Sequence, residues 1–75
     1  MDNKNLNRLK VALAEKGVSN KWLAEQMGIT QATVSKWVTN TSQPSLEALM
    51  KIARILDVPV DSLLRFEELS EVEKY

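Results

Sequence analysis

The residue types that most often perform covalent, acid–base or metal chemistry are scarce in this chain of 75 residues. It contains no histidine and no cysteine, so it lacks the commonest general base and metal ligand, and it can form neither a disulfide nor a thiolate site. Ser19, Ser35 and the scattered carboxylates have no imidazole beside which to act, and helix caps and solvated faces explain their spacing. We therefore expect no enzyme, no metal site and no cofactor.

The stretch Asn20–Thr39, NKWLAEQMGITQATVSKWVT, places small or apolar residues wherever two short crossing helices require them. Ala24 leaves room for helices that cross at roughly 90–120°, and Gly28 lies where the chain must reverse. The apolar residues that line one face of each helix and the turn between them are Leu23, Met27, Ile29, Val34 and Trp37. The pattern predicts a helix-turn-helix whose second helix directs polar side chains outward.

Length and charge limit the possible classes of protein. Seventy-five residues allow one domain. The net charge is zero, but it is segregated: residues 1–56 hold eight Lys/Arg and four acids, whereas residues 57–75 hold two Lys/Arg and six acids. The basic part can bind phosphates with one face, although more weakly than a uniformly basic domain would. No apolar run approaches the roughly 20 residues of a membrane span, and the polar start lacks the core of a signal peptide, so we expect a cytoplasmic protein.

Apolar periodicity predicts an all-α fold of five helices. The expected elements are about Leu6–Lys16, Asn20–Met27, Gln31 to about Val38, Leu46–Leu56, and a short helix through Leu63 and Leu64. The expected domain covers residues 1–64, with the helix-turn-helix at 20–39, and residues 65–75 form an acidic tail or a dimerisation segment.

Local signals predict how these helices begin and end. Ser19, Thr30, Ser45 and Asp61 are the expected N-caps of the second to fifth helices. Asn40 is expected in the left-handed conformation, and Pro44 prevents the third helix from continuing. The expected buried face of the fourth helix comprises Leu46, Leu49, Ile52, Ala53 and Leu56.

These segments resemble the Cro and lambda-repressor-like DNA-binding domains, often called the xenobiotic-response-element family. The resemblance spans roughly Leu9–Leu64 and rests on KGVSNKWLAEQMGITQATVSKW followed by PSLEALMKIARILDVPVDSLL, with the family's order and loop lengths. It implies five helices in one compact domain, the third in the major groove of double-stranded DNA and the second above the phosphate backbone. Such domains usually bind as dimers.

The resemblance also implies roles for single residues. Base contacts are expected from Gln31, Ala32, Ser35 and Lys36, and phosphate contacts from Asn20, Thr33, Thr39, Asn40, Thr41 and Ser42. The chemistry fits, because an amide can bond adenine, an ammonium can reach guanine and a methyl can touch thymine. Each role has a structural alternative: an exposed polar face is often only solvated, Asn20 and Thr30 can be helix caps, and loop hydroxyls can serve turn geometry.

Several positions differ from the family pattern. Many members pair an Arg on the first helix with a Glu at the end of the third, whereas this chain has Leu13 and Val38. An apolar pair can replace a buried ion pair without loss, so the change does not argue against the fold. Ser45 replaces an Arg that some members insert into the minor groove. Trp22 stands at a usually polar position, where it can cover the first helix or meet a partner.

Two functions follow as hypotheses. The first is a sequence-specific transcriptional regulator that binds a palindromic operator as a homodimer, with half-sites about 10 base pairs apart. Its dimer contacts are expected from Leu64, Phe66, Leu69 and Val72, which can alternatively cap the core locally. The second is an antitoxin or co-regulator that binds another protein through its acidic tail.

Overall fold

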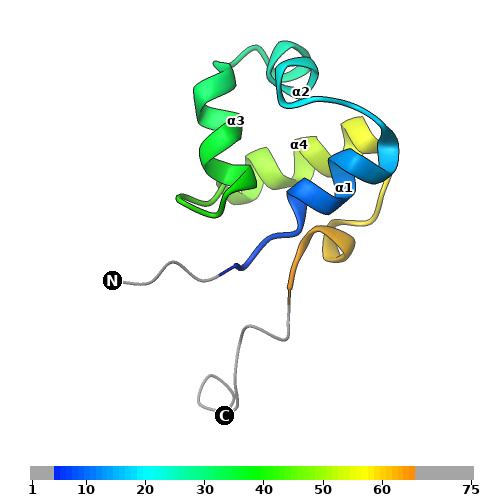
Figure 1. The fold of residues 1–75 in the computed structure, drawn as a ribbon. Coiled ribbons are helices and arrows are strands. Elements are labelled where there is room, and N and C mark those ends of the chain that lie inside the picture. Colours follow the sequence, from blue (N-terminus) through cyan, green and yellow to red (C-terminus); the bar gives the residue numbers. More distant parts are fainter. Residues whose placement is uncertain (1–4, 66–75) are drawn as a thin grey trace.

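The computed structural model describes residues 5–65, which form four α-helices and one short 3₁₀ helix (Figure 1). They are α1 (Leu9–Lys16), α2 (Asn20–Met27), α3 (Gln31–Val38), α4 (Leu46–Leu56) and the 3₁₀ helix η1 (Val60–Leu63). The all-α class is confirmed. The fifth helix, however, is a single 3₁₀ turn of four residues rather than an α-helix.

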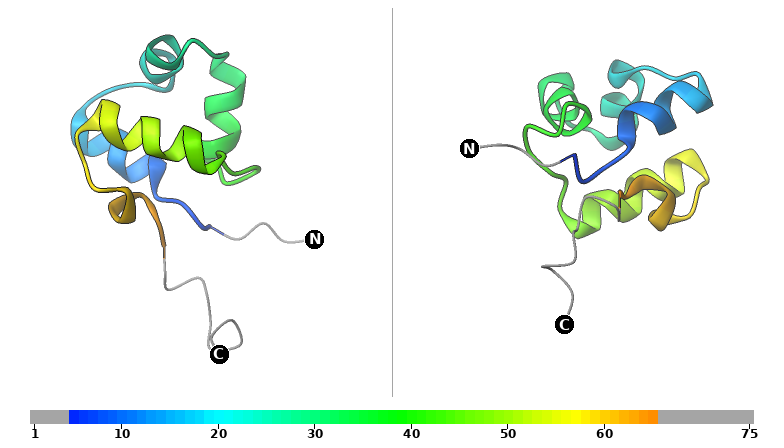
Figure 2. Two further views of the ribbon diagram at one scale, coloured as in Figure 1. Left: turned by 180° about the vertical axis from the view of Figure 1, so that it is seen from behind. Right: turned by 60° about the horizontal axis from the view of Figure 1, so that its bottom comes forward.

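The helices pack as two crossed pairs. α1 and α4 lie side by side, and α3 crosses their ends with α2 beside it (Figures 1 and 2). The core between the pairs draws on every element, and its buried apolar residues are Leu9, Ala12, Leu13, Leu23, Ala24, Val34, Trp37, Leu49, Ile52, Ala53, Leu56 and Leu63. The helix-turn-helix thus rests on α1 and α4 as its support.

Short polar side chains start three of the helices as predicted. The hydroxyl of Ser19 accepts a hydrogen bond from the Trp22 amide at 3.0 Å, and the hydroxyl of Ser45 accepts one from the Ala48 amide at 3.1 Å. Thr30 caps α3 in the same way. Asp61 does not cap the last helix, because the turn already begins at Val60, directly after Pro59, and Asp61 lies inside it.

A left-handed residue lies at or directly after the C-cap of each α-helix. Gly28 has φ +69°, and apart from its chain neighbours no atom lies within 4 Å of where a side-chain Cβ would be, so the backbone conformation alone favours glycine here. Asn40 adopts φ 61° as predicted, and Asp57, for which no such conformation was predicted, adopts φ 58° after α4. Short polar residues tolerate this conformation better than other non-glycine residues do.

The predicted start of α1 at Leu6 is wrong, because the helix begins at Leu9. Residues before it run antiparallel to the end of the described chain, with a bridge between Asn7 and Leu64. The Arg65 amide donates to the Leu6 carbonyl at 2.8 Å, and the Arg8 amide donates to the Leu63 carbonyl at 2.9 Å. This pairing uses the backbone groups that a longer helix would have needed.

The predicted buried face of α4 is right for four residues and wrong for Leu46, which is 72% exposed. Leu46 lies one helical turn from Met50, which is 56% exposed, and both face away from the stripe that contains Leu49 and Ile52. Two apolar side chains therefore remain on the surface of α4.

The two residues that replace the family's ion pair lie in apolar surroundings. Leu13 is buried in the core, and Val38 is half-buried and packs against it. Trp22 is also half-buried and packs against the core, whereas Trp37 is almost fully buried, as expected. The indole of Trp22 thus covers the core from α2.

Candidate nucleic-acid interface

One side of α3 is polar and faces away from the core. Val34 and Trp37 are buried, whereas Gln31, Ala32 and Lys36 are exposed. At about 100° per residue, the three exposed residues lie on the side of the helix opposite Val34 and Trp37. The structure therefore brings three of the four predicted base-contacting residues together on one surface.

Ser35, the fourth predicted base contact, lies at the edge of this surface and is half-buried. The side-chain amide of Asn20, at the start of α2, donates a hydrogen bond to the Ser35 hydroxyl at 3.4 Å. Ser19 is the N-cap of α2, so Asn20 is not needed as a cap and sits in the first helical position. The contact places the N-terminal end of α2 beside the outward side of α3.

The predicted phosphate-binding hydroxyls are partly engaged within the domain. The hydroxyls of Thr30 and Thr33 are hydrogen-bonded to each other, with their oxygens 2.9 Å apart. The Thr39 hydroxyl donates to the Ser35 carbonyl at 3.0 Å and lies 2.8 Å from the Thr41 hydroxyl. These groups contact a phosphate only after the hydroxyl rotates, because each carries one hydrogen.

The loop after α3 turns its amides inward. The amides of Thr41 and Ser42 both donate to the Lys36 carbonyl, at 2.8 and 3.2 Å, which closes the end of α3. The main-chain amides of Thr41 and Ser42 are therefore engaged within the domain. The Ser42 side chain is exposed, and within residues 5–65 its hydroxyl makes no hydrogen bond.

Asn40 has an internal structural role. Its side chain is 6% exposed, and its Oδ1 accepts hydrogen bonds from the Asn7 amide and from the Gln43 side chain, both at 3.0 Å. Its Nδ2 donates to the Asn7 carbonyl at 3.3 Å. Because these groups are spent inside the domain, we do not retain Asn40 as a phosphate contact.

Asn7 completes a network of three side-chain amides that sequence reasoning missed. Its Nδ2 donates to the Trp37 carbonyl at 2.9 Å and to the Gln43 side chain at 2.8 Å, and its Oδ1 accepts from the Leu9 amide at 3.0 Å. The network ties the chain before α1 to the loop after α3. The available signal was an Asn two residues before an apolar helix, since Asn is a residue that favours helix starts.

The charged groups of the described residues do not meet the requirements of a metal site. Within the described residues, no cluster of three or more His, Cys, Asp or Glu side chains is able to hold a metal ion. The ion pair between Lys51 and Glu47 joins their side chains at 3.7 Å across one turn of α4, and both side chains are exposed. Such a pair contributes little to stability.

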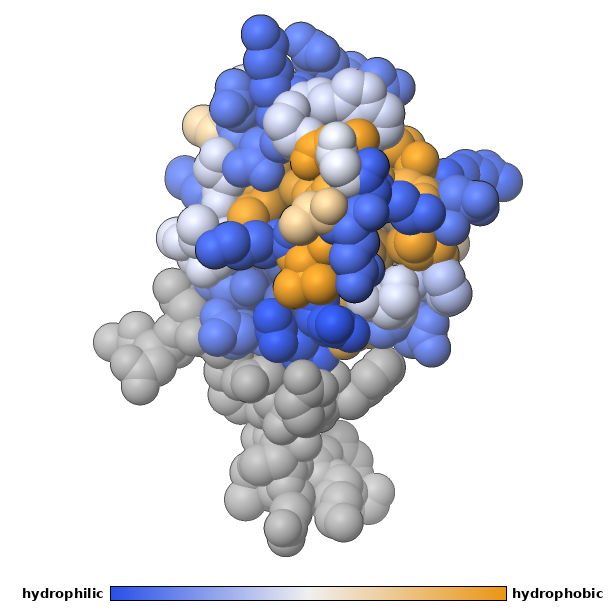
Figure 3. Space-filling view, turned by 45° about the vertical axis from the view of Figure 1, so that its right-hand side comes forward, coloured by the Kyte–Doolittle hydropathy of each residue, from blue (hydrophilic) through white to orange (hydrophobic). Residues whose placement is uncertain are grey.

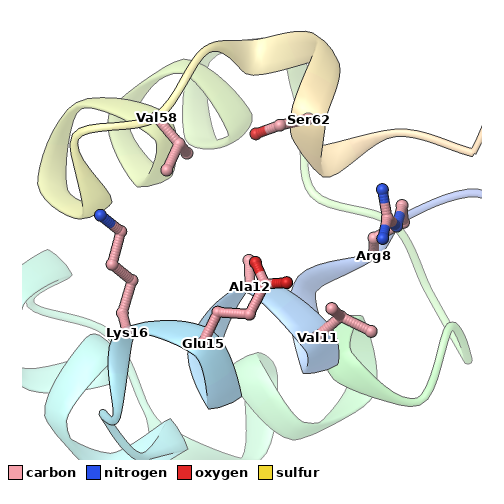
Figure 4. A pocket seen from close by; sticks show the side chains of 7 residues that line it. All are labelled: Arg8, Val11, Ala12, Glu15, Lys16, Val58 and Ser62. Carbon is pink, nitrogen blue, oxygen red and sulfur yellow. The ribbon is translucent and has the colours of Figure 1, made fainter.

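A hollow on another face is too small to serve as an active site. Figure 3 shows the side of the molecule on which the C-terminal ends of α1 and α4 lie. Apolar atoms gather in the middle of this face. The hollow holds about 120 Å³ and lies between α1 and the segment that contains Val58 and Ser62 (Figure 4). Ligand sites usually measure roughly 300–1,000 Å³. The lining of the hollow includes two basic side chains, Arg8 and Lys16, and one acidic side chain, Glu15.

The fold and the outward side of α3 agree with a comparison to protein families. The model of the Cro/C1-type HTH DNA-binding domain matches residues 8–68, which is most of the chain. The chain belongs to this Cro/C1-type family. The family model describes a DNA-binding domain, in agreement with the expectation that the chain is not an enzyme.

Relatives of this chain are known in bacteria. The chain is 33% identical over 67 residues to the HTH-type transcriptional activator BcrR of Enterococcus faecalis, covering 89% of this chain and 31% of that protein. It is 34% identical over 67 residues to the HTH-type transcriptional regulator SinR of Bacillus licheniformis, covering 88% of this chain and 60% of that protein. The chain thus spans about a third to three-fifths of the length of these relatives.

A solved structure of a candidate DNA-binding protein from Bacteroides fragilis superimposes on this Cro/C1-type domain with a TM-score of 0.79. The two chains are 53% identical, and the match covers 80% of this chain and 97% of the other. No helix in residues 5–65 is long and apolar enough to cross a membrane.

Proposed function

We propose that this chain is a transcriptional regulator of the cytoplasm that binds double-stranded DNA sequence-specifically as a homodimer, on a palindromic operator. The observation that carries the proposal is the outward side of α3, where Gln31, Ala32 and Lys36 are exposed together on a helix that α2 and the core hold in place. A helix held in this way fits the major groove of B-DNA.

Base reading is assigned to the exposed side of α3. The Gln31 amide can bond both groups on the edge of adenine, the Lys36 ammonium can bond guanine, and the Ala32 methyl can contact a thymine methyl. Ser35 lies at the edge of this surface and already accepts the hydrogen bond from Asn20, so we assign it to positioning as much as to base contact. A good bidentate contact discriminates by about 1–3 kcal/mol.

Phosphate contacts are assigned to the residues around this side. Asn20 stands at the N-terminal end of α2, where the helix dipole favours an anion, and it retains donor capacity beyond Ser35. Thr33, Thr39, Thr41 and Ser42 supply hydroxyls. Such contacts fix the register on the duplex and carry no sequence information.

A single domain is only weakly charged, so one copy is expected to bind DNA weakly. A homodimer doubles the number of DNA contacts and so raises the overall affinity for DNA, which supports the dimer. Leu64 is half-buried, pairs with Asn7 and packs against the core, so only part of its side chain is available for a partner. The other predicted dimer residues, Phe66, Leu69 and Val72, lie outside the described residues.

The test is selection of bound sequences from a random duplex pool, followed by affinity measurements on the winner. We expect a palindrome whose half-sites lie about 10 base pairs apart, bound at least 10³-fold more tightly than unrelated DNA. Recovery of no preferred sequence would contradict the regulator proposal.

Segregated charge favours a second candidate function, an antitoxin or co-regulator that binds another protein. Residues 65–75, the predicted tail, carry four acids and two Lys/Arg, so this segment is acidic. Removal of residues 67–75 separates the two functions. Loss of protein binding with intact DNA binding would support the second function, whereas loss of DNA affinity would support a tail that serves the dimer.

A further inference from the structure

A pocket of about 360 Å³ lies beside the C-terminal end of α3. The segment before α1 passes this end of α3 in both views of Figure 2, and it forms one wall of the pocket. Among residues 5–65, the walls contain two cationic side chains and no acid, and the lining residues are Asn5, Asn7, Lys10, Val38, Thr39, Asn40 and Arg65. The pocket adjoins the helix to which base reading is assigned.

The pocket lies along the same edge of α3 as Asn20. Ser35 accepts the hydrogen bond from Asn20, and Val38, which lines the pocket, follows Ser35 by three residues. Residues three apart are neighbours on a helix surface, so Ser35 and Val38 occupy one edge. Asn20 and Lys10 thus flank successive turns of that edge, where a single strand of a bound duplex would run.

Lys10 is the group in this pocket with unused bonding capacity. Its side chain is exposed in the first turn of α1, and within residues 5–65 it forms no ion pair. The side-chain amide of Asn7 bonds Gln43 and the Trp37 carbonyl, and the side-chain amide of Asn40 bonds Gln43 and the main chain of Asn7. A lysine ammonium is a mobile point charge with three donors, and it sits here near the positive end of the α1 dipole.

Arg65 shapes the opposite wall. Its Nε donates to the Asn7 carbonyl at 3.3 Å, which holds the guanidinium stem against the amide network. The other described lining residues besides Lys10 and Arg65 are uncharged, so none of them competes with an anionic oxygen for the Lys10 ammonium.

We propose that Lys10 binds a phosphate of the DNA backbone next to the bases read by α3, in the pocket that Lys10 lines beside the C-terminal end of α3. This inference rests on the proposed function. It adds α1 to the DNA-contacting surface and supplies a cation on the side where Asn20 offers only a neutral amide. The contact is independent of base sequence, because phosphates carry no sequence information.

The experiment compares K10Q, K10R and K16Q with the wild type by fluorescence anisotropy on a labelled duplex, between 50 and 200 mM salt. Lys16 is the matched control. It is an exposed lysine of the same helix, but its side chain lines the separate hollow beside Val58. For K10Q we expect the slope of log affinity against log salt to fall in magnitude by about 0.9 per subunit, which is about 1.8 for the proposed homodimer, so the affinity deficit of K10Q shrinks about twelvefold over this range. K10R and K16Q should keep the wild-type slope.

The outcomes separate this inference from the proposed function. An unchanged slope in K10Q, with wild-type binding intact, would overturn the Lys10 contact and leave the regulator proposal standing. A loss of slope in K10R equal to that in K10Q would also overturn it, because the charge is retained. A wild type that binds no duplex even at 50 mM salt would overturn both proposals together. Equal melting temperatures of the four proteins confirm that only binding has changed.

Discussion

Replacement of Asn7 by alanine tests whether the amide network holds the end of α3. Asn7 is 3% exposed, and its side chain makes three hydrogen bonds, to the Trp37 carbonyl, the Gln43 side chain and the Leu9 amide. Alanine would remove all three and would leave buried main-chain groups without partners. At roughly 0.5–1.5 kcal/mol per bond, we expect a loss of about 3 kcal/mol in the free energy of unfolding.

This loss is large for so small a domain. A chain of 75 residues is expected to have a stability of about 4–11 kcal/mol. A loss of 3 kcal/mol would lower the melting temperature by about 12–24 °C. The measurement is urea denaturation followed by helical circular dichroism, because four of the elements are α-helices and report the whole transition.

Asn5 provides the matched control. It is the same residue type two positions earlier, but it is exposed. N5A should stay within about 0.5 kcal/mol of the wild type, as surface substitutions usually do. If N7A also stayed within that range, or if both variants lost stability equally, the argument that this network ties the chain before α1 to the loop after α3 would be refuted.

Three further predictions follow from single contacts. Ser45→Ala removes the cap of α4 and should cost about 1 kcal/mol by urea denaturation, and an unchanged midpoint would show that the Ala48 amide needs no side-chain acceptor. Leu49→Ala should cost about 2–5 kcal/mol because Leu49 is buried, whereas Leu46→Ala, at a site 72% exposed, should cost far less, and equal losses would contradict the assignment of the faces of α4. Lys36→Ala should weaken discrimination at one base step by about 1–3 kcal/mol, whereas Asn20→Ala should weaken binding to all duplexes alike, and the reverse pattern in competition binding would exchange the two roles.

The helix-turn-helix was predictable because its signals are local. Ser19 and Thr30 cap the two helices and Gly28 stands in the turn, so the bounds of α2 and α3 follow from residues within a few positions of each end. The bounds of α4 were predicted in the same way from Ser45. The outward side of α3 follows from its helical period alone, since Val34 and Trp37 fix which side is buried.

The failures involve contacts between distant parts of the chain. Leu6 continues the spacing of an apolar helix, but backbone pairing with residues 64 and 65 holds it outside α1. The left-handed conformation of Asn40 was predicted from its residue type, whereas the partner of its side chain lies 33 residues away in Asn7. Local patterns contain no information on such pairs. For Leu46, the period alone did not show that the face it shares with Met50 has no neighbouring element to cover it.

The central claim is that the exposed side of α3 enters the major groove. The most direct measurement is a titration of the isotope-labelled protein with its selected duplex, followed by amide chemical shifts in nuclear magnetic resonance spectra. We predict the largest changes at Gln31, Lys36 and Asn20, with smaller ones at Lys10 and only slight ones at Lys16. Changes concentrated on the exposed side of α4, with α3 unaffected, would contradict the claim.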